Sequence, residues 1–150
     1  DGVRVRFIGR RDRLSPRIAK LLAWSEQATE HNTDTTLVLA LDYGGRWDVT
    51  DVVRSIAHDV ADGQIAPEDI NEDLISKRLS TSGIPDPDLC IRTAGEARIS
   101  NFLLWQLAYA EFWFTEVLWP DFDEAVLDLA LAAYAVRERR FGVRPLLHRY

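Results

Sequence analysis

The chain has little of several features that point to particular classes of protein. It has one cysteine, Cys90, so no disulfide can form within it, which fits a reducing compartment such as the cytoplasm. Its start lacks a basic region followed by a short apolar core, and no stretch is long and apolar enough to span a bilayer. Its net charge of -6 disfavours a broad basic surface, so we expect no nucleic-acid partner.

Familiar nucleotide-binding and hydrolase motifs are also missing from the sequence. It contains no Gly-x-x-x-x-Gly-Lys phosphate loop, no Gly-x-Gly-x-x-Gly and no Gly-x-Ser-x-Gly turn. Its histidines, His31, His58 and His148, show no spacing typical of metal ligands. We therefore expect no metal site built on histidine.

Strand patterns alternate with helix patterns along the whole chain. Apolar or alternating runs predict strands at 3–8, 36–41 and 89–91, of which the second is expected to be covered on both faces. The predicted helices are one from Ser15-Pro16 to near His31-Asn32, one ending at Gly63, a short one capped by Asn71, one from Ser100 to about Ala110, and one from Asp123 to near Arg140. This order predicts a single α/β domain over 1–150, with a parallel β-sheet flanked by helices.

The stretch at the end of the third predicted strand carries the clearest functional signal. The strand runs into Arg92, a turn of small residues follows at 93–95, and then come Arg98 and Ser100, the latter as a predicted helix N-cap. Ligands of parallel α/β sheets bind beyond the carboxyl ends of the strands. Two guanidinium groups, a hydroxyl and the N–H groups of a helix start suit a pyrophosphate. The alternative is a set of surface ion pairs beside a routine cap.

Other features leave their alternatives open. The turn at 43–46 holds two adjacent glycines, which either serve a ligand site or simply allow a positive φ. Glu111 lies in an otherwise apolar run, so an arginine, a metal or water must offset its desolvation. Glu96 can pair with either neighbouring arginine or help to hold a cation. The aromatic run at 112–114, with Trp119 and Phe122, is either core or a subunit interface.

Several segments together resemble the cis-prenyltransferases, and they cover nearly the whole chain in order. The segments are Asp42-Tyr43-Gly44-Gly45-Arg46-Trp47-Asp48, Ile91-Arg92-Thr93, Gly95-Glu96, Arg98-Ile99-Ser100-Asn101-Phe102-Leu103-Leu104-Trp105-Gln106, Ala108-Tyr109-Ala110-Glu111 and Trp119-Pro120-Asp121-Phe122. The resemblance implies the α/β fold of that family and a Mg²⁺-dependent condensation of isopentenyl pyrophosphate onto an allylic, farnesyl-type pyrophosphate. Each new double bond would be Z, and the expected product is the undecaprenyl carrier lipid, through which the protein contacts the membrane.

The resemblance also implies roles for particular residues. The pyrophosphate of isopentenyl pyrophosphate would be bound by Arg92, Arg98, Ile99 and Ser100. Glu111 would take part in the magnesium site, and Arg140 and Gly142 would reach across a homodimer to the same pyrophosphate. Independently of the family, a glycine two residues after an arginine lets a backbone N–H approach an anion closely.

The sequence departs from the family pattern in two respects. Ala97 stands where family members often carry histidine, so any role of that side chain is lost. The amino-terminal His-x-x-x-Asp-Gly-Asn-Gly-Arg-Trp motif, whose aspartate binds magnesium in the family, is not in this chain. Asp1-Gly2 does not belong to that motif, because Val3 follows. We therefore expect the carboxyl-terminal portion of a longer enzyme, with no catalytic residue of its own and inactive alone.

Two other functions remain open from the sequence. The first is a non-catalytic partner subunit of a heterodimeric cis-prenyltransferase, which keeps the fold and the terminal Arg-x-Gly. Retention of both arginines, Ser100 and Glu111 favours the catalytic type. The second is a phosphate-binding α/β domain of unrelated function.

Overall fold

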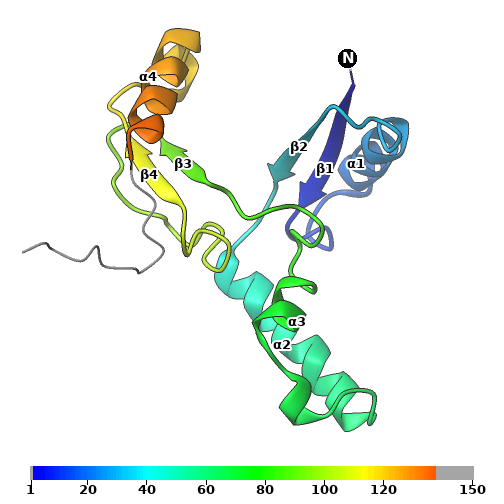
Figure 1. The fold of residues 1–150 in the computed structure, drawn as a ribbon. Coiled ribbons are helices and arrows are strands. Elements are labelled where there is room, and N and C mark those ends of the chain that lie inside the picture. The colour runs from blue at the N-terminus through cyan, green and yellow to red at the C-terminus, as the bar shows by residue number, and fades with distance from the viewer. Residues whose placement is uncertain (1, 138–150) are drawn as a thin grey trace, which may run out of the picture. The chain divides into compact units, whose positions relative to one another are not determined.

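The structure is a computed structural model of the chain, and it describes residues 2–137. Its helices and strands, drawn in Figure 1, are β1 (Val3–Ile8), α1 (Pro16–Ala28), β2 (Thr35–Ala40), α2 (Gly45–Ala61), α3 (Glu72–Ser76), β3 (Leu89–Arg92), β4 (Glu111–Phe114) and α4 (Glu124–Ala135). Short 3-10 turns lie at Pro67–Asp69 and Trp119–Asp121. The described residues form two compact units, a first one of 2–85 with 101–104 and a second one of 86–100 with 105–137.

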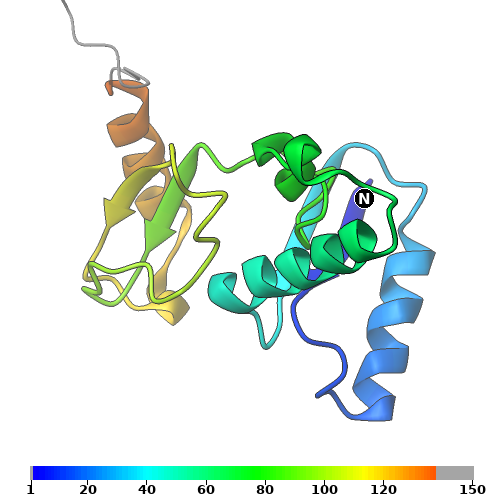
Figure 2. The ribbon, with the colours of Figure 1, turned by 90° about the horizontal axis from the view of Figure 1, so that it is seen from below.

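The first unit is built on a parallel pair of strands, as the sequence predicted. β1 and β2 pair along their whole lengths. A parallel pair needs a crossover connection, and α1 supplies it and packs against β1 (Figure 2). The start of α1 is also confirmed, because the Ile18 N–H donates to Ser15 Oγ at 3.4 Å and Pro16 lies in the first turn, where its missing N–H costs nothing.

Polar side chains of α1 and of the residue after it contact the backbone of β1. The Phe7 N–H donates to Glu26 Oε1 at 2.9 Å, and the Val5 N–H donates to Thr29 Oγ1 at 3.0 Å. An amide hydrogen used in this way is not available to β2. The helix therefore covers the edge of β1 that faces away from β2, and its polar groups replace a further strand there.

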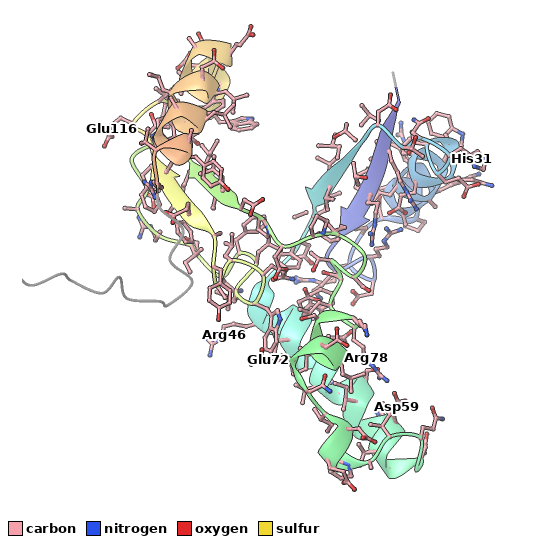
Figure 3. All side chains as sticks on the ribbon, viewed as in Figure 1. His31, Arg46, Asp59, Glu72, Arg78 and Glu116 are labelled. Carbon is pink, nitrogen blue, oxygen red and sulfur yellow. The ribbon has the colours of Figure 1, made fainter. Side chains whose placement is uncertain are left out.

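The long helix α2 and the short α3 complete the first unit. Val52 and Ile56 are buried on one face of α2, and Gly63, with φ +70°, follows its end as predicted. Arg78, just after α3, forms an ion pair with Asp59 of α2, and both are labelled in Figure 3. The predicted cap of α3 is confirmed, since Asn71 Oδ1 accepts from the Leu74 N–H at 2.9 Å.

The second unit is also built on a parallel pair, β3 and β4. The sequence predicted β3 but not β4, whose aromatic residues are typical of strands. α4 packs against β4, and its predicted cap is confirmed because Asp123 Oδ1 accepts from the Val126 N–H at 3.0 Å. α4 ends at Ala135, earlier than predicted. Trp119 is 73% exposed and stacks on Phe122 at 5.9 Å between ring centroids, so it is not a core residue within 2–137.

The helix predicted from Ser100 to about Ala110 is wrong. Within 93–110 the described chain forms turns and no helix. Ser100, Asn101 and Leu103 have φ of 49°, 66° and 43°, which lie in the left-handed region and cannot continue a right-handed helix. The apolar spacing that predicted a helix instead serves contacts of 101–104 with the start of α2 in the first unit.

The prediction that the second strand is covered on both faces is also wrong for the described residues. Leu37 and Leu39 of β2 are 47% and 39% exposed. The strand has apolar residues typical of a buried position, but within 2–137 its only pairing partner is β1. In the same part of the chain, the helices are each too short or too polar to traverse a bilayer.

Candidate functional site

The turn after β3 is shaped by backbone hydrogen bonds to the segment that follows β4. The Arg92 carbonyl at the end of β3 accepts from the Thr115 N–H at 3.0 Å. The Ala94 N–H donates to the Val117 carbonyl and the Gly95 N–H to the Thr115 carbonyl, both at 2.9 Å. Ala94 and Gly95 have left-handed φ of 63° and 67°. The carboxyl end of β3 is therefore held in one backbone conformation.

The two arginines of the predicted pyrophosphate site meet at one carboxylate. Arg92 Nη2 lies 3.6 Å from Glu96 Oε2, and Arg98 Nε donates to the same oxygen. Arg92 Nη1 also donates to the Arg98 carbonyl at 2.6 Å. Glu96, for which pairing with either arginine was left open, pairs with both. The two guanidinium groups lie together at the end of the strand, while their binding of pyrophosphate stays a prediction.

In this cluster, Glu96 and Arg98 each stabilise the charged form of the other. The hydrogen bond from Arg98 lowers the pKa of the Glu96 carboxyl below its usual value, and the positive charges of both arginines lower it further. The same hydrogen bond raises the pKa of Arg98. One carboxylate between two guanidinium groups leaves a net positive charge. With 68% of its side chain exposed, Arg98 is accessible to an anion that carries more charge than one carboxylate.

The remaining residues predicted to bind pyrophosphate differ in what the structure says of them. Ile99 is 39% exposed, and Ser100 directly follows it in a left-handed conformation. Because no helix begins at Ser100 in the described chain, the predicted contribution of helix N–H groups is wrong, while a contact of the Ser100 hydroxyl with pyrophosphate stays a prediction. Arg140 and Gly142 lie outside the described residues.

Glu111 is the first residue of β4, and an arginine offsets its desolvation. Its N–H donates to the Asp88 carbonyl at 2.9 Å, which continues the pairing with β3. Its Oε2 accepts from Arg137 Nη1 at 2.6 Å. Of the alternatives that the sequence left open, the structure shows the ion pair.

The part that Glu111 could take in a magnesium site is limited to one ligand. Among residues 2–137, no group of three His, Cys, Asp or Glu side chains is arranged to hold a metal ion. Mg²⁺ commonly binds through one or two carboxylates together with substrate phosphate oxygens and water. Glu111, with 29% of its side chain exposed, fits a single carboxylate ligand of such a shared site.

The glycines of the turn at 43–46 do not adopt a positive φ. Gly44 has φ -150°, and Gly45 is the first residue of α2, so the positive-φ interpretation is wrong here. A Cβ on Gly44 would lie 2.8 Å from Asn101 Nδ2, and one on Gly45 would lie 2.8 Å from Leu104 Cγ. The glycines let the segment 101–104 approach the start of α2.

The buried carboxylate beside this turn, Asp48, was not predicted from the sequence as a site residue. Asp48 is 3% exposed, and its Oδ2 accepts from the Tyr43 hydroxyl and the Ser80 hydroxyl, both at 2.9 Å. Its Oδ1 accepts from the Ser80 N–H at 3.1 Å. Asp48 precedes the buried Val52 and Ile56 at a spacing of four residues, so its position on the apolar face of the helix was the available signal.

Comparison with known proteins identifies the family. Residues 1–142 match the family described as "Putative undecaprenyl diphosphate synthase". An isoprenyl transferase of Porphyromonas gingivalis is 54% identical over 142 residues, which cover 95% of this chain and 56% of that protein. A ditrans,polycis-undecaprenyl-diphosphate synthase of Xanthomonas axonopodis pv. citri, named as specific for (2E,6E)-farnesyl diphosphate, is 53% identical over 142 residues, which cover 95% of this chain and 55% of that protein.

A solved structure agrees with these sequence relatives. The crystal structure of lavandulyl diphosphate synthase from Lavandula x intermedia, in complex with dimethylallyl diphosphate, has a TM-score of 0.90 and 42% identity. The match covers 93% of this chain and 60% of that one. The plant protein therefore shares the fold of this chain.

Parallel strand pairs with neighbouring helices, and paired arginines at the end of one strand, define an α/β protein with a candidate anion site. The matches narrow that class, and the chain belongs to the undecaprenyl diphosphate synthase family of cis-prenyltransferases. The resemblance seen in the sequence and the α/β fold class are both confirmed. The chain spans 56% and 55% of the lengths of the two curated relatives named above.

Proposed function

We propose that the complete protein condenses isopentenyl pyrophosphate with an allylic pyrophosphate of the farnesyl type, and that this chain binds the isopentenyl pyrophosphate. The condensation breaks the allylic C–O bond, forms a C–C bond to the terminal alkene carbon, and releases pyrophosphate and a proton. The proposed product is a Z-polyprenyl pyrophosphate, the undecaprenyl carrier. The observation that carries the proposal is the convergence of Arg92 and Arg98 on one carboxylate oxygen in a chain of this family.

In the proposed complex, an oxygen of the pyrophosphate takes the position of the Glu96 carboxylate between the two guanidinium groups. Pyrophosphate has more charge and more acceptor oxygens than a carboxylate, so it can engage both arginines at once. The hydroxyl of Ser100 adds a further donor. Holding this substrate beside the allylic carbon supplies proximity, and the positive charge stabilises a polyanionic reaction centre.

We further propose that Glu111 contributes one ligand to a Mg²⁺ ion shared with substrate. Such an ion, when bound, stabilises the negative charge that develops on a departing pyrophosphate. Glu111 would exchange its partner Arg137 for the ion. Arg140 and Gly142 are proposed to complete the site from the second copy of a homodimer. A cytoplasmic location is proposed because the sequence has a single cysteine.

An arginine substitution in the complete gene product tests the site. Arg98→Ala is expected to raise the KM for isopentenyl pyrophosphate by roughly 10- to 100-fold and to lower kcat, because a charge-assisted contact to the pyrophosphate is lost. The measurement is incorporation of labelled isopentenyl pyrophosphate into a farnesyl pyrophosphate primer. Arg54→Ala is the control, since Arg54 is exposed, pairs with Asp51 at 3.6 Å and lies in α2 of the first unit.

The outcomes separate the proposed reaction from the proposed site. Failure of the wild-type gene product to elongate any allylic primer would overturn the reaction. Elongation with an unchanged KM in the Arg98→Ala protein would overturn the site alone. Mass spectrometry of the product and a parallel assay with dimethylallyl pyrophosphate identify the chain length and the allylic substrate.

A further inference from the structure

Helix α1 carries apolar side chains on the face that it turns away from β1. On its inner face, Leu22 is 6% exposed and Glu26 accepts from the Phe7 N–H of the strand. On its outer face, Leu21 and Trp24 are 54% and 64% exposed. Within residues 2–137, α1 packs against β1 (Figure 2), and these two outer side chains remain in contact with solvent.

The exposed side chains form a continuous stripe along the helix. Its members at intervals of four, three and four residues lie on one side of an α-helix, and they are Arg17, Leu21, Trp24 and Ala28. Lys20 lies four residues before Trp24 and borders the same side. All five are exposed, and we call them the outer stripe of α1.

The charge of the outer stripe is positive only. Glu26 is the one acidic residue of α1, and it lies on the inner face and forms an ion pair with Arg11 at 2.6 Å. The three arginines at 10–13 all pair with carboxylates, whereas Arg17 and Lys20 form no ion pair with another residue of 2–137. The stripe therefore carries uncompensated positive charge in a chain whose net charge is -6.

An exposed tryptophan beside a leucine and two cations suits the surface of an anionic membrane. Tryptophan has an apolar body and a polar N–H, and it favours the boundary between hydrocarbon and water. Lysine and arginine are attracted by anionic headgroups, and their alkyl stems can lie along the apolar layer. Helices that bind membrane surfaces combine these residue types. A protein interface suits the stripe less well, because lysine is depleted from such interfaces.

We propose that the outer stripe of α1 binds the surface of a membrane that contains anionic phospholipids. Leu21 and Trp24 enter the boundary between headgroups and acyl chains, and Arg17 and Lys20 contact the lipid phosphate groups. The inner face of the helix stays packed on β1. The proposal goes beyond the function proposed above, because binding to a membrane needs neither substrate. Prenyl transfer and membrane binding can therefore fail independently of each other.

Sedimentation of the complete gene product with lipid vesicles tests the proposal. Vesicles of mixed phosphatidylglycerol and phosphatidylcholine are compared with vesicles of phosphatidylcholine alone, in the absence of substrate. A cation near an anionic membrane strengthens binding by roughly 5-fold, so the two cations of the stripe predict a preference of roughly 25-fold for the anionic vesicles. High salt is expected to reduce this preference, because it screens the attraction.

Substitutions in the stripe separate its apolar and charged contributions. Trp24→Gln is expected to weaken binding to anionic vesicles by roughly 10-fold, because it removes apolar surface that enters the membrane. Arg17→Gln combined with Lys20→Gln is expected to abolish the preference for anionic lipid. The matched control combines Val53→Gln with Arg54→Gln in α2 of the same unit, where Val53 is 54% exposed and the Arg54 side chain is 65% exposed. This control is expected to bind as the wild type does.

Several results would overturn the proposal. One is a wild-type protein that binds neither kind of vesicle, and another is an equal loss of binding in the control in α2. Urea unfolding and light scattering of Trp24→Gln test the other possible occupants of the stripe. A large loss of stability would show that another part of the complete protein covers Trp24, and a lower molecular mass would show that a second copy does. Either result contradicts the proposal, whereas unchanged stability and mass with weaker vesicle binding support it.

Discussion

Two turns of this chain carry glycine shortly after a parallel strand, and the glycines serve different purposes. In the turn at 43–46, Gly45 is buried and its missing side chain leaves room for Leu104. In the turn at 93–96, Gly95 is exposed and has φ +67°. A Cβ there would meet the carboxylate of Glu116, which is the end of a flexible side chain. Volume limits the first position and backbone conformation limits the second.

The first of these turns therefore serves packing, and the second carries exposed charge. The segment 101–104 and the buried Asp48 form hydrogen bonds with residues of the first turn, and these bonds fix its conformation. The second turn keeps two guanidinium groups at the surface around Glu96. A binding site for a polyanion needs accessible charge, and the second turn provides it, whereas the first turn belongs to the packing of the first unit.

The largest effect is expected from removing the carboxylate that holds the first turn. Asp48→Ala should lower the free energy of unfolding by about 2–4 kcal/mol, because the hydroxyls of Tyr43 and Ser80 and the Ser80 N–H lose their acceptor. Urea unfolding of the complete protein measures it. Asp51→Ala is the control, as Asp51 lies on the same helix with 60% of its side chain exposed. Equal losses in the two variants would contradict a structural role for Asp48.

A volume limit at Gly45 predicts that larger residues cost more. Gly45→Ala should lower the free energy of unfolding by about 1–3 kcal/mol through overpacking against Leu104, and Gly45→Asn should lower it further. The urea midpoints of the two variants provide the measurement. If Gly45→Asn proves more stable than Gly45→Ala, backbone conformation and not volume governs this position.

At Gly95 the order of the same two substitutions should reverse. Gly95→Ala should cost about 1 kcal/mol, since alanine is strained at positive φ, while Gly95→Asn should cost less. Glu116→Ala in the Gly95→Ala background separates strain from collision with the carboxylate. Full recovery of stability in that double variant would show that the contact with Glu116, and not φ, limits the position.

The smallest effect concerns the pKa of Glu96. The hydrogen bond from Arg98 lowers this pKa, so the ion pair contributes stability above the usual pKa of glutamate and loses it as the pH falls through the lowered value. An NMR titration of the Glu96 side-chain carboxyl carbon should give a value below the usual range in the wild type. In Arg98→Ala the value should move back up. An unchanged value in that variant would mean that another group sets the pKa.

Local features of the fold were predictable from the sequence. Caps at Ser15, Asn71 and Asp123 each accept from an N–H three residues later, so a few neighbouring residues specify them. β1, β2 and β3 were predictable for the same reason, because apolar runs of strand length are a local pattern. The arginines of the candidate site were recognised from their place after a strand.

The features that the sequence did not reveal depend on residues far apart in the chain. The apolar spacing after Ser100 is compatible with a helix, but Asn101 bonds to a backbone N–H 55 residues away, and its left-handed φ excludes a helix start. In the sequence, Asp48 is an ordinary acidic residue in the first turn of a helix. Only the fold places Ser80 within hydrogen-bond distance of it. The pairing of β4 with β3 was not predicted either, because it joins two separate segments of the chain.

By itself, the sequence determined the α/β class, the family, the caps of three helices and the identity of the charged residues, because each of these depends on short segments of neighbouring residues. Only the tertiary structure decided that the glycines at 44 and 45 make room for a neighbouring segment, that Asn101 caps α2, and that Arg92 and Arg98 share one carboxylate. The physical reason is that steric fit and ion pairing depend on distances across space, which the order of residues does not contain.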